Sequence, residues 1–370
     1  MAKLGEVCLL KAGKFVSAND ISPEYNKGLY PCFGGNGIRG YVADYTHDGE
    51  FPLIGRQGAL CGNVNLASGK FHATEHAVVV QPKIEMNVHW LYYALNAMNL
   101  GQYATGAAQP GLAVSKLETL SIEIPNISEQ NKIAQTLCKV EQLVNFRKQQ
   151  LAKLDELVKA RFVEMFGNPS NNSLGFPYEP LSNCLLSIEN GKSFVCSNDM
   201  RQEENPAILK LSAVTYGVYQ QDENKAILDS SMFVKSAEVH KGDLLFTRKN
   251  TPELVGMCAY VNDTAPNLMM PDLIFRLNTN EKINKIFLWK LINHEFFRGK
   301  IQNIATGSAK SMSNISKERL EKLAIILPPL HLQNDFAAFV ERVDKQKQTV
   351  QQSLEKLELM KKALMQEYFG

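Results

Sequence analysis

A segment of about fifty residues occurs twice in this chain, and that repeat limits the folds it can adopt. Residues 117–167 align with residues 320–370 at a constant offset of 203 and without a gap. The positions that match across the alignment include Leu117/Leu320, Glu118/Glu321, Leu120/Leu323, Pro125/Pro328, Gln130/Gln333, Asn131/Asn334, Lys153/Lys356 and Phe166/Phe369. Register held over this length indicates duplication of an ancestral unit.

Each copy carries an apolar stripe with the 4,3 spacing of one face of a helix. The first stripe is Ile133, Leu137, Val140, Val144, Leu151, Leu154, Val158 and Met165, and the second is Phe336, Val340, Val343, Val350, Leu354, Leu357 and Leu364. Where Arg147 interrupts the first stripe, the second has Val350, and where Lys347 interrupts the second, the first has Val144. Two helices of about 38 residues, roughly 57 Å long, are therefore predicted to form an intramolecular coiled coil. The alternative is two surface helices that pack on their own domains.

The segments before each helix also correspond to one another. Short apolar runs around residues 4–7, 28–31, 40–43, 51–54 and 77–80, separated by Gly, Asn and Asp, predict strands, whereas residues 87–97 predict a helix. Residues 181–198 resemble residues 4–19, and residues 243–248 resemble residues 51–56. An Ala-Thr-Gly segment precedes both repeated helices. The predicted fold class is α+β, with two similar strand-rich globular domains separated by two long helices and an internal pseudo-twofold repeat.

The predicted boundaries follow the repeat. They are a first globular domain at 1–126, a first helix at 127–167, a linker at 168–180, a second globular domain at 181–329 and a second helix at 330–370. The net charge is +2, so any nucleic-acid surface must be a local patch. Seven cysteines without a CxxC pair indicate neither a disulfide framework nor a zinc site, and no apolar run is long enough to span a membrane. We expect a soluble cytoplasmic protein.

Taken together, this layout resembles the specificity (S) subunits of type I restriction-modification systems. The resemblance rests on the order of elements, the glycine loop at residues 34–37, the two Ala-Thr-Gly segments, and the Gln-Asn pair that opens each long helix. It covers essentially the whole chain. The resemblance implies two target recognition domains that each read one half of a bipartite DNA site, and an antiparallel coiled coil that spaces them and docks methyltransferase subunits.

Several further expectations come from this resemblance. The chain is expected to be non-catalytic, to bind double-stranded DNA and two copies of a methyltransferase (M) subunit, and to need no cofactor itself. S-adenosylmethionine and ATP are expected on the partner subunits, and the resemblance is compatible with restriction/translocase (R) subunits as further partners. Because the two domains differ in their loops, the two halves of the DNA target are expected to differ.

Motifs for other chemistries are incomplete. The GxGxxG match at residues 35–40 is followed by a strand-like run rather than a helix, so a glycine turn is favoured over a dinucleotide site. The GKS at residues 191–193 lacks the upstream glycine of a P-loop, and Asp272 with Glu281 lacks the spacing of a PD-ExK nuclease. His72 and His76 lie four apart in an extended segment, where they do not converge on a metal.

Candidate DNA-contacting residues lie among glycines and polar residues at strand ends and loops. Arginine can pair with guanine through two hydrogen bonds, and Asn or Gln can do so with adenine. The candidates are Arg39, Arg56, Gln57, Gln109, Arg248, Lys249, Asn250, Ser308 and Lys310. For each of them the alternative is a solvated surface side chain, although the equivalence of Arg56 and Arg248 in the two repeats favours a role for that pair. The competing function is a coiled-coil scaffold whose heads bind protein or glycan.

Overall fold

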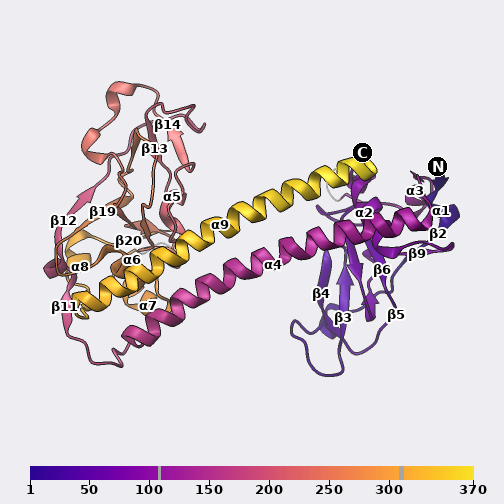
Figure 1. The fold of residues 1–370 in the computed structure, drawn as a ribbon, viewed down its shortest axis with the longest axis horizontal. Coiled ribbons are helices and arrows are strands. Elements are labelled where there is room, and N and C mark those ends of the chain that lie inside the picture. Colours follow the sequence, from indigo (N-terminus) through magenta and orange to yellow (C-terminus); the bar gives the residue numbers. More distant parts are fainter. Residues whose placement is uncertain (107–109, 308–311) are drawn as a thin grey trace. The chain divides into compact units, whose positions relative to one another are not determined.

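Two helices of 40 residues each, α4 (Ile127–Phe166) and α9 (Leu330–Phe369), connect two compact units in the computed structural model of the protein. The structure describes residues 1–106, 110–307 and 312–370. The first unit comprises residues 1–149 and 350–370, and the second comprises residues 150–349. Both long helices run through both units (Figure 1).

The first unit contains two four-stranded sheets. One has the order β2 (Cys8–Ala12), β9 (Ala77–Pro82), β6 (Phe51–Gly55), β7 (Val64–Ala67), all antiparallel. The other has the order β4 (Gly37–Val42), β3 (Tyr30–Gly34), β8 (Lys70–Ala73), β5 (His47–Asp48). A short pair joins β1 (Ala2–Lys3) to β10 (Ser121–Ile122), and the helices before α4 are α1 (Leu4–Val7), α2 (Val88–Ala97) and α3 (Val114–Glu118).

The second unit repeats this arrangement, except that its second sheet has three strands instead of four among the described residues. Its main sheet has the order β12 (Leu185–Asn190), β19 (Ile274–Thr279), β15 (Leu244–Thr247), β17 (Cys258–Tyr260). Its second sheet has the order β14 (Asn224–Ala226), β13 (Ala207–Leu209), β18 (Leu268–Met269). In both units one strand of this second sheet has an antiparallel and a parallel neighbour. The short pairs are β11 (Tyr178–Pro180) with β21 (Ala324–Ile326) and β16 (Lys249–Asn250) with β20 (Ser313–Asn314). The predicted internal repeat is confirmed.

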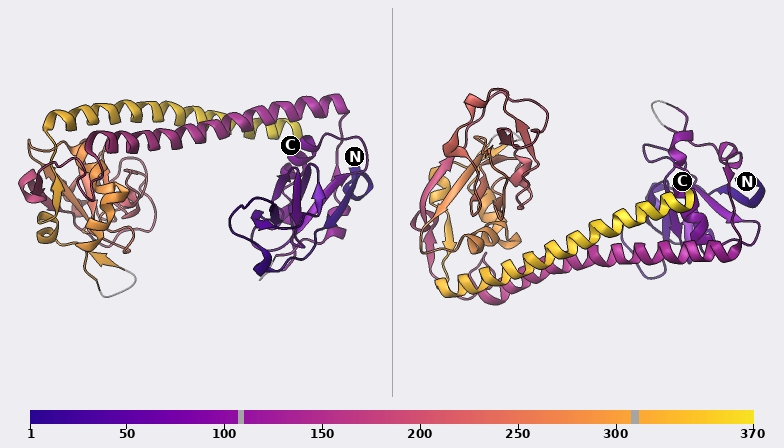
Figure 2. Two further views of the ribbon diagram at one scale, coloured as in Figure 1. Left: turned by 90° about the horizontal axis from the view of Figure 1, so that it is seen from below. Right: turned by 45° about the horizontal axis from the view of Figure 1, so that its top comes forward.

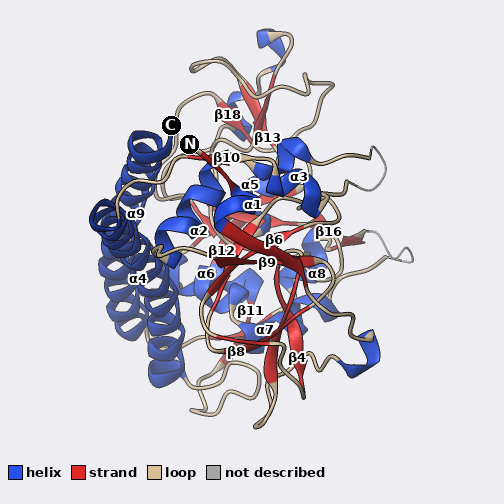
Figure 3. Cartoon of the chain, turned by 90° about the vertical axis from the view of Figure 1, so that its right-hand side faces the viewer, coloured by secondary structure: helices blue, strands red, loops and turns tan. Residues whose placement is uncertain are grey.

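The helices of the second unit complete the correspondence. They are α5 (Ser212–Thr215), α6 (Lys285–Asn293), α7 (Glu295–Asn303) and α8 (Lys317–Glu321). In each unit one short helix, α2 or α6, lies between the long helices and the sheets, as the blue and red elements of Figure 3 show. Each of these two helices begins after an asparagine cap, Asn87 or Asn284, whose side-chain oxygen accepts backbone N–H groups of the first turn.

The long helices pack against each other in antiparallel register in each unit (Figure 2). Leu137 and Val144 are buried in the first unit, and Val340 and Val343 are buried in the second, as the predicted stripes require. Polar pairs fix the register: Lys361 Nζ lies 2.7 Å from Glu141 Oε1 in the first unit. The predicted coiled coil is confirmed. The lysines that interrupt the second stripe are paired with carboxylates of the facing helix.

Two local features differ from expectation. Residues 4–7 were expected as a strand but form the single helical turn α1, because Leu4 and Val7 share one buried face at i, i+3 and the backbone N–H of Lys3 donates to the Glu6 carboxylate at 3.0 Å. Residues 168–173, expected in a linker, fold into a tight turn in which the Asn168 backbone N–H donates to Ser173 Oγ at 2.9 Å.

Candidate nucleic-acid interface

The two arginines that directly follow the corresponding strands β6 and β15 occupy equivalent backbone positions. Arg56 donates its N–H to the carbonyl of His76 (3.0 Å) and accepts at its own carbonyl from the N–H of Leu112 (2.9 Å). Arg248 donates to the carbonyl of Leu273 (3.0 Å) and accepts from Ile315 (2.8 Å). Leu112 and Ile315 are themselves 203 residues apart, as the repeat requires. The fold therefore places one arginine after the end of the same inner strand in each unit.

A loop leaves each unit beside its arginine. In the first unit Thr105 and Gly111 exchange two backbone hydrogen bonds of 2.8 Å, and in the second Thr306 and Asn314 exchange two of 2.8 and 2.7 Å. Gln57 pairs with Gly111, and Lys249 pairs with Asn314. The enclosed loops contain Gln109 in one unit and Ser308 and Lys310 in the other, and these three residues lie outside the described part of the chain.

Two of the candidates in the first unit, Arg39 and Gln57, line one surface hollow. A depression of about 470 Å³ is lined by Gly34, Gly35, Asn36, Arg39, Gln57, Gly58, Ala59, Leu60 and His76. Arg39 and Gln57 are exposed there, and Arg56 precedes Gln57 with its side chain half-buried. The hollow thus offers guanidinium, amide and imidazole donors within one region that open solvent can reach.

Glycines bring these segments together. The turn between β3 and β4 is Gly35–Asn36, which confirms the predicted glycine turn, and it is followed by the strand β4. A Cβ atom at Gly55 would lie 1.9 Å from the carbonyl oxygen of Gly35, so only glycine permits the turn to contact the end of β6. Sequence reasoning treated Arg39 and Gln57 as separate candidates, and the close approach of the glycine backbone makes them neighbours.

The second unit arranges its candidates differently. The Arg248 guanidinium lies 4.9 Å from the centre of the Phe275 ring, and Nη2 donates to Asn314 Oδ1 at 3.3 Å. Asn250 is buried, with Nδ2 donating to Thr215 Oγ1 (3.0 Å) and Oδ1 accepting from the N–H of Thr251 (2.9 Å). The Asn250 amide is therefore occupied within the protein, whereas Lys249 is half-buried at the surface.

The loop after Asn250 is held by an arginine that sequence reasoning did not single out. Arg298 donates from Nη1 to the carbonyl of Gly256 (2.9 Å) and from Nη2 to that of Val255 (2.6 Å). A hollow of about 350 Å³ beside this loop is lined by Pro252, Glu253, Gln302, Ala305, Gly307 and Ser313. Its residue types differ from those of the hollow in the first unit.

The duplicated Gln-Asn pair attaches each globular domain to its long helix. Gln130 Oε1 accepts the N–H of Asn87 (2.9 Å), and Asn131 Oδ1 accepts from Asn87 Nδ2 (2.7 Å). Gln333 and Asn334 make the same contacts with Asn284, at 2.8 and 3.0 Å. The sequence shows that these residues are identical in the two copies. Their role in attaching the domain is visible only from the tertiary contacts.

A second polar contact links the short helix to the long helix in the first unit. The Tyr93 hydroxyl donates to Glu141 Oε2 at 2.7 Å. Burial raises the pKa of Tyr93, and the hydrogen bond to Glu141 raises it further. The position that corresponds to Tyr93 in α6 is Lys290, which reaches toward Asp344, the counterpart of Glu141.

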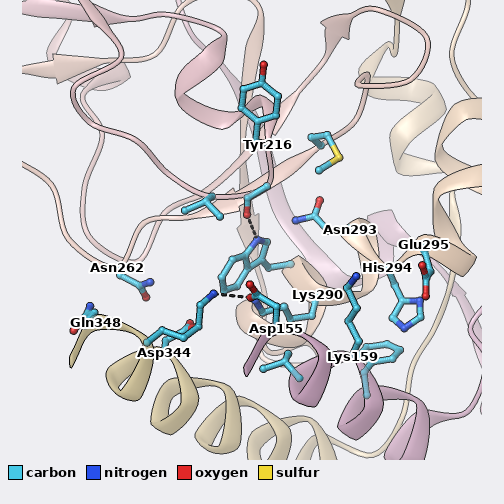
Figure 4. Close-up of a pocket in the computed structure, with 17 residues that line it drawn as sticks. Asp155, Lys159, Tyr216, Asn262, Lys290, Asn293, His294, Glu295, Asp344 and Gln348 are labelled. Carbon is cyan, nitrogen blue, oxygen red and sulfur yellow. Dashed lines mark hydrogen bonds and ion pairs between the residues drawn. The ribbon is translucent and has the colours of Figure 1, made fainter. Parts of the chain in front are cut away.

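Lys290 lines a cavity of about 540 Å³ in the second unit (Figure 4). Trp289 forms one wall, with Nε1 donating to the carbonyl of Gly217 at 2.9 Å, and Lys347 pairs with Asp155 at 2.6 Å. Lys290 Nζ lies 3.5 Å from the centre of the Trp289 ring. Burial lowers the pKa of Lys290 to about 8, and burial raises the pKa of Asp344.

The residues of the rejected motifs have structural partners. Asp272 accepts a hydrogen bond from Ser193 Oγ, and His72 Nε2 lies 3.1 Å from the carbonyl of Lys14. Within residues 1–106, 110–307 and 312–370, no three His, Cys, Asp or Glu side chains are grouped to hold a metal ion. No helix in these ranges is both long and apolar enough to cross a lipid bilayer.

Comparison with known proteins identifies one family. The sequence profile of the type I restriction modification DNA specificity domain matches residues 1–156 and 185–359. The EcoprrI specificity subunit of Escherichia coli is 53% identical over 143 residues, which cover 38% of this chain and 36% of that protein. The EcoDI specificity subunit of Escherichia coli is 21% identical over 382 residues, covering 95% of this chain and 82% of that protein. The alignment at 53% identity therefore covers about a third of the length of the EcoprrI subunit.

Solved structures share the fold. The S subunit of a type I restriction-modification system from M. genitalium superposes with a TM-score of 0.68 at 15% identity, covering 100% of this chain and 95% of that one. A chain from a structural study of type I complex assembly gives a TM-score of 0.53 at 14% identity, covering 100% and 96%. The alternative of a scaffold for protein or glycan has no support among these relatives.

Proposed function

The chain belongs to the type I restriction modification DNA specificity family, and we propose that it reads a bipartite, asymmetric DNA target. The target recognition domains span residues 1–126 and 181–329, and each reads one half of the site. The observation that carries this proposal is the pair of equivalent arginines, Arg56 and Arg248, each placed at the same strand end beside a loop of different length and composition.

Recognition of an asymmetric target requires domains that place equivalent side chains on the DNA but surround them with different residues. An arginine at a fixed position can reach a guanine in the major groove through two parallel hydrogen bonds. The surrounding groups then select neighbouring bases, and they differ: Arg39, Gln57 and His76 in the first unit, Lys249 and Ser313 in the second. The two domains should therefore recognise different short sequences.

In this proposal the chain recognises the DNA sequence, and the partner subunits carry out the catalysis. Its partners in this proposal are double-stranded DNA and two copies of a methyltransferase subunit, with restriction/translocase subunits as further members of the complex in the cytoplasm. S-adenosylmethionine and ATP belong to those partners. Exposed apolar side chains on the long helices support protein docking there: Phe146 is 62% exposed and Leu359 is 68% exposed.

The test compares adenine modification across the genome of cells with the intact gene and with single variants. Arg56→Lys keeps the charge but loses the two-pronged guanine contact. We expect this variant to relax one half of the modified motif and leave the other half unchanged, with Arg248→Lys doing the converse.

Two outcomes would contradict the proposal. Loss of the gene without any change in the modification pattern would exclude a role in DNA targeting. An unchanged motif in both lysine variants would limit the two arginines to phosphate contacts. In vitro, the affinity of the assembled complex for DNA should fall steeply as salt rises, whereas a protein-binding scaffold would show little dependence.

A further inference from the structure

A cysteine, a histidine and a glutamate from three separate elements form a chain of contacts in the first unit. Cys138 lies on α4, His89 lies in the first turn of α2, and Glu50 immediately precedes β6. Cys138 Sγ is 3.4 Å from His89 Nδ1, and His89 Nε2 is 3.2 Å from Glu50 Oε2. The carboxylate thus orients the imidazole, whose other nitrogen faces the thiol.

This is the arrangement that activates a nucleophile. A neutral imidazole with its hydrogen on Nε2 donates to Glu50 and leaves Nδ1 free to accept the thiol proton. The His89 and Glu50 side chains are 39% and 40% exposed, and Cys138 is half-buried, so the three side chains lie at the boundary between the core and solvent. We propose that Cys138 is a reactive thiol, activated by His89 and Glu50, that forms mixed disulfides with small disulfide molecules.

The fold does not need these side chains. In the second repeat the residue that corresponds to Cys138 is Glu341, and the one that corresponds to His89 is Ile286. There α6 packs against α9 as α2 packs against α4, and the equivalent Gln-Asn contacts hold its cap residue. A thiol, an imidazole and a carboxylate in contact are therefore a property of the first unit rather than a requirement of the architecture.

The chemistry balances without a further reactant. His89 accepts the proton of Cys138, and the thiolate attacks one sulfur of the small disulfide. A new sulfur–sulfur bond forms to Cys138 as the old one breaks, and the departing thiolate takes the proton from His89. One half of the small disulfide leaves as a free thiol, the other half stays joined to Cys138 in the mixed disulfide, and the imidazole returns to its neutral form.

The other six cysteines are poorly suited to this reaction. Cys8, Cys32, Cys61, Cys184 and Cys258 are buried. Burial raises the pKa of every one of these thiols, and that of Cys8 reaches about 11. Cys196 is half-buried like Cys138, but its pKa is also raised by burial and its thiol donates to the carbonyl of Phe194 at 3.4 Å. Cys196 is therefore a matched internal control.

An adduct on Cys138 would disturb the attachment of the domain to the long helices. The Tyr93 hydroxyl is 3.6 Å from Cys138 Sγ and donates to Glu141, which in turn pairs with Lys361 of α9. A group attached to the sulfur competes with Tyr93 for this space. We expect the modified protein to unfold at a lower temperature than the unmodified protein.

The experiment uses the full-length protein and 2-hydroxyethyl disulfide, an uncharged probe. Mass spectrometry of the digested protein over time gives separate rates for Cys138 and Cys196. We expect Cys138 to react at least tenfold faster. His89→Gln and Glu50→Gln should each slow Cys138 several-fold without changing Cys196, and Cys138→Ser should abolish the fast adduct.

Two results overturn the proposal. The first is a Cys138 rate equal to or below that of Cys196. The second is a Cys138 rate unchanged by both His89→Gln and Glu50→Gln in variants whose circular dichroism matches the parent protein. Glu50→Gln keeps the test decisive if His89→Gln misfolds, because Glu50 lies at the surface. The reaction does not depend on DNA recognition, so failure here leaves the proposed function untouched.

Discussion

One buried side-chain amide in each unit joins the globular domain to its long helix through hydrogen bonds to backbone groups. Gln333 is fully buried, accepts the backbone N–H of Asn284 and donates to the carbonyl of Pro328 at 2.7 Å. Gln130 does the same at the start of α4, donating to Pro125 at 2.9 Å. A buried amide that satisfies backbone groups of two other segments cannot be replaced by an apolar side chain without leaving those groups unpaired.

Gln333→Ala should therefore destabilise the second unit by roughly 2–3 kcal/mol, because a buried N–H and a buried carbonyl lose their partner. Urea unfolding followed by circular dichroism measures this loss. Gln346→Ala is the control, since Gln346 is exposed on the same helix and should change stability by less than about 0.5 kcal/mol. Equal effects of the two variants would contradict the assigned role.

Lys290 provides a pH-dependent test at the same scale. Because burial lowers its pKa to about 8 from 10.5, the charged form that predominates below pH 8 is less favourable in the folded protein than in the unfolded chain. The unfolded chain binds the extra proton between pH 8 and 10.5, so stability rises with pH in that window.

Lys290→Met should consequently stabilise the second unit at pH 7 by about 1–2 kcal/mol, and the gain should shrink between pH 8 and 10.5. Thermal unfolding across this range is the measurement. Lys345→Met, at an exposed position of α9, should show no such pH-dependent gain. A Lys290→Met protein that is less stable at pH 7 would indicate that the lysine stabilises Asp344 more than its burial costs.

At the scale of elements, α4 and α9 combine an apolar seam with ion pairs of unequal burial. Lys361 and Glu141 are each about one-third exposed, whereas Lys148 and Glu358, 3.0 Å apart, are 57% and 49% exposed. Exposed pairs contribute little because water and side-chain entropy offset the attraction. Burial alone raises the pKa of Glu141, but hydrogen bonds from Lys361 and Tyr93 lower it by more.

Lys361→Ala should destabilise the first unit by about 1–2 kcal/mol because it leaves a partly buried carboxylate with one partner fewer, whereas Lys148→Ala should cost less than about 0.5 kcal/mol. The pKa of Glu141 is lowered by folding, so the contribution of the pair is present above pH 4.5 and is lost as pH falls below it. Urea unfolding at pH 7 and pH 3.5 tests both points. Equal penalties at the two pH values would show that the charge pair is not the cause.

At the scale of the whole molecule, each unit has its own hydrophobic core. One core includes Trp90, Leu137 and Leu117, and the other includes Phe162, Phe287 and Phe336. The described residues of the two candidate DNA surfaces belong to different units. Under the proposed function, separate cores and separate surfaces predict that the two halves of a target are read independently.

The energetic effects of Arg56→Lys and Arg248→Lys on DNA affinity should therefore add. Sites without shared contacts are additive within about 0.5 kcal/mol. Fluorescence anisotropy with the assembled methyltransferase complex and a duplex carrying the full target gives the four affinities. A coupling free energy larger than about 1 kcal/mol would indicate that the two domains do not bind their halves of the target independently.

The sequence by itself determined the duplication, the two long helices, their apolar seam and the strand-rich character of the domains. These features follow from periodicity and from residue identity at a constant offset, which depend on neighbours close along the chain. Helix α2 and strands β6 and β9 were predictable for the same reason, and the turn α1 was missed because four residues are too few to distinguish a period of 3.6 from a period of 2.

Only the tertiary structure decided which distant residues meet. The hollow containing Arg39 and Gln57 depends on the contact of Gly35 with Gly55, and the Cys138–His89–Glu50 chain joins residues from three elements. Such contacts arise when sheets and helices pack, and no local pattern encodes them. The repeat makes the same point: similar sequences place Tyr93 and Lys290 at one position, and packing against Glu141 or Asp344 decides the chemistry of each.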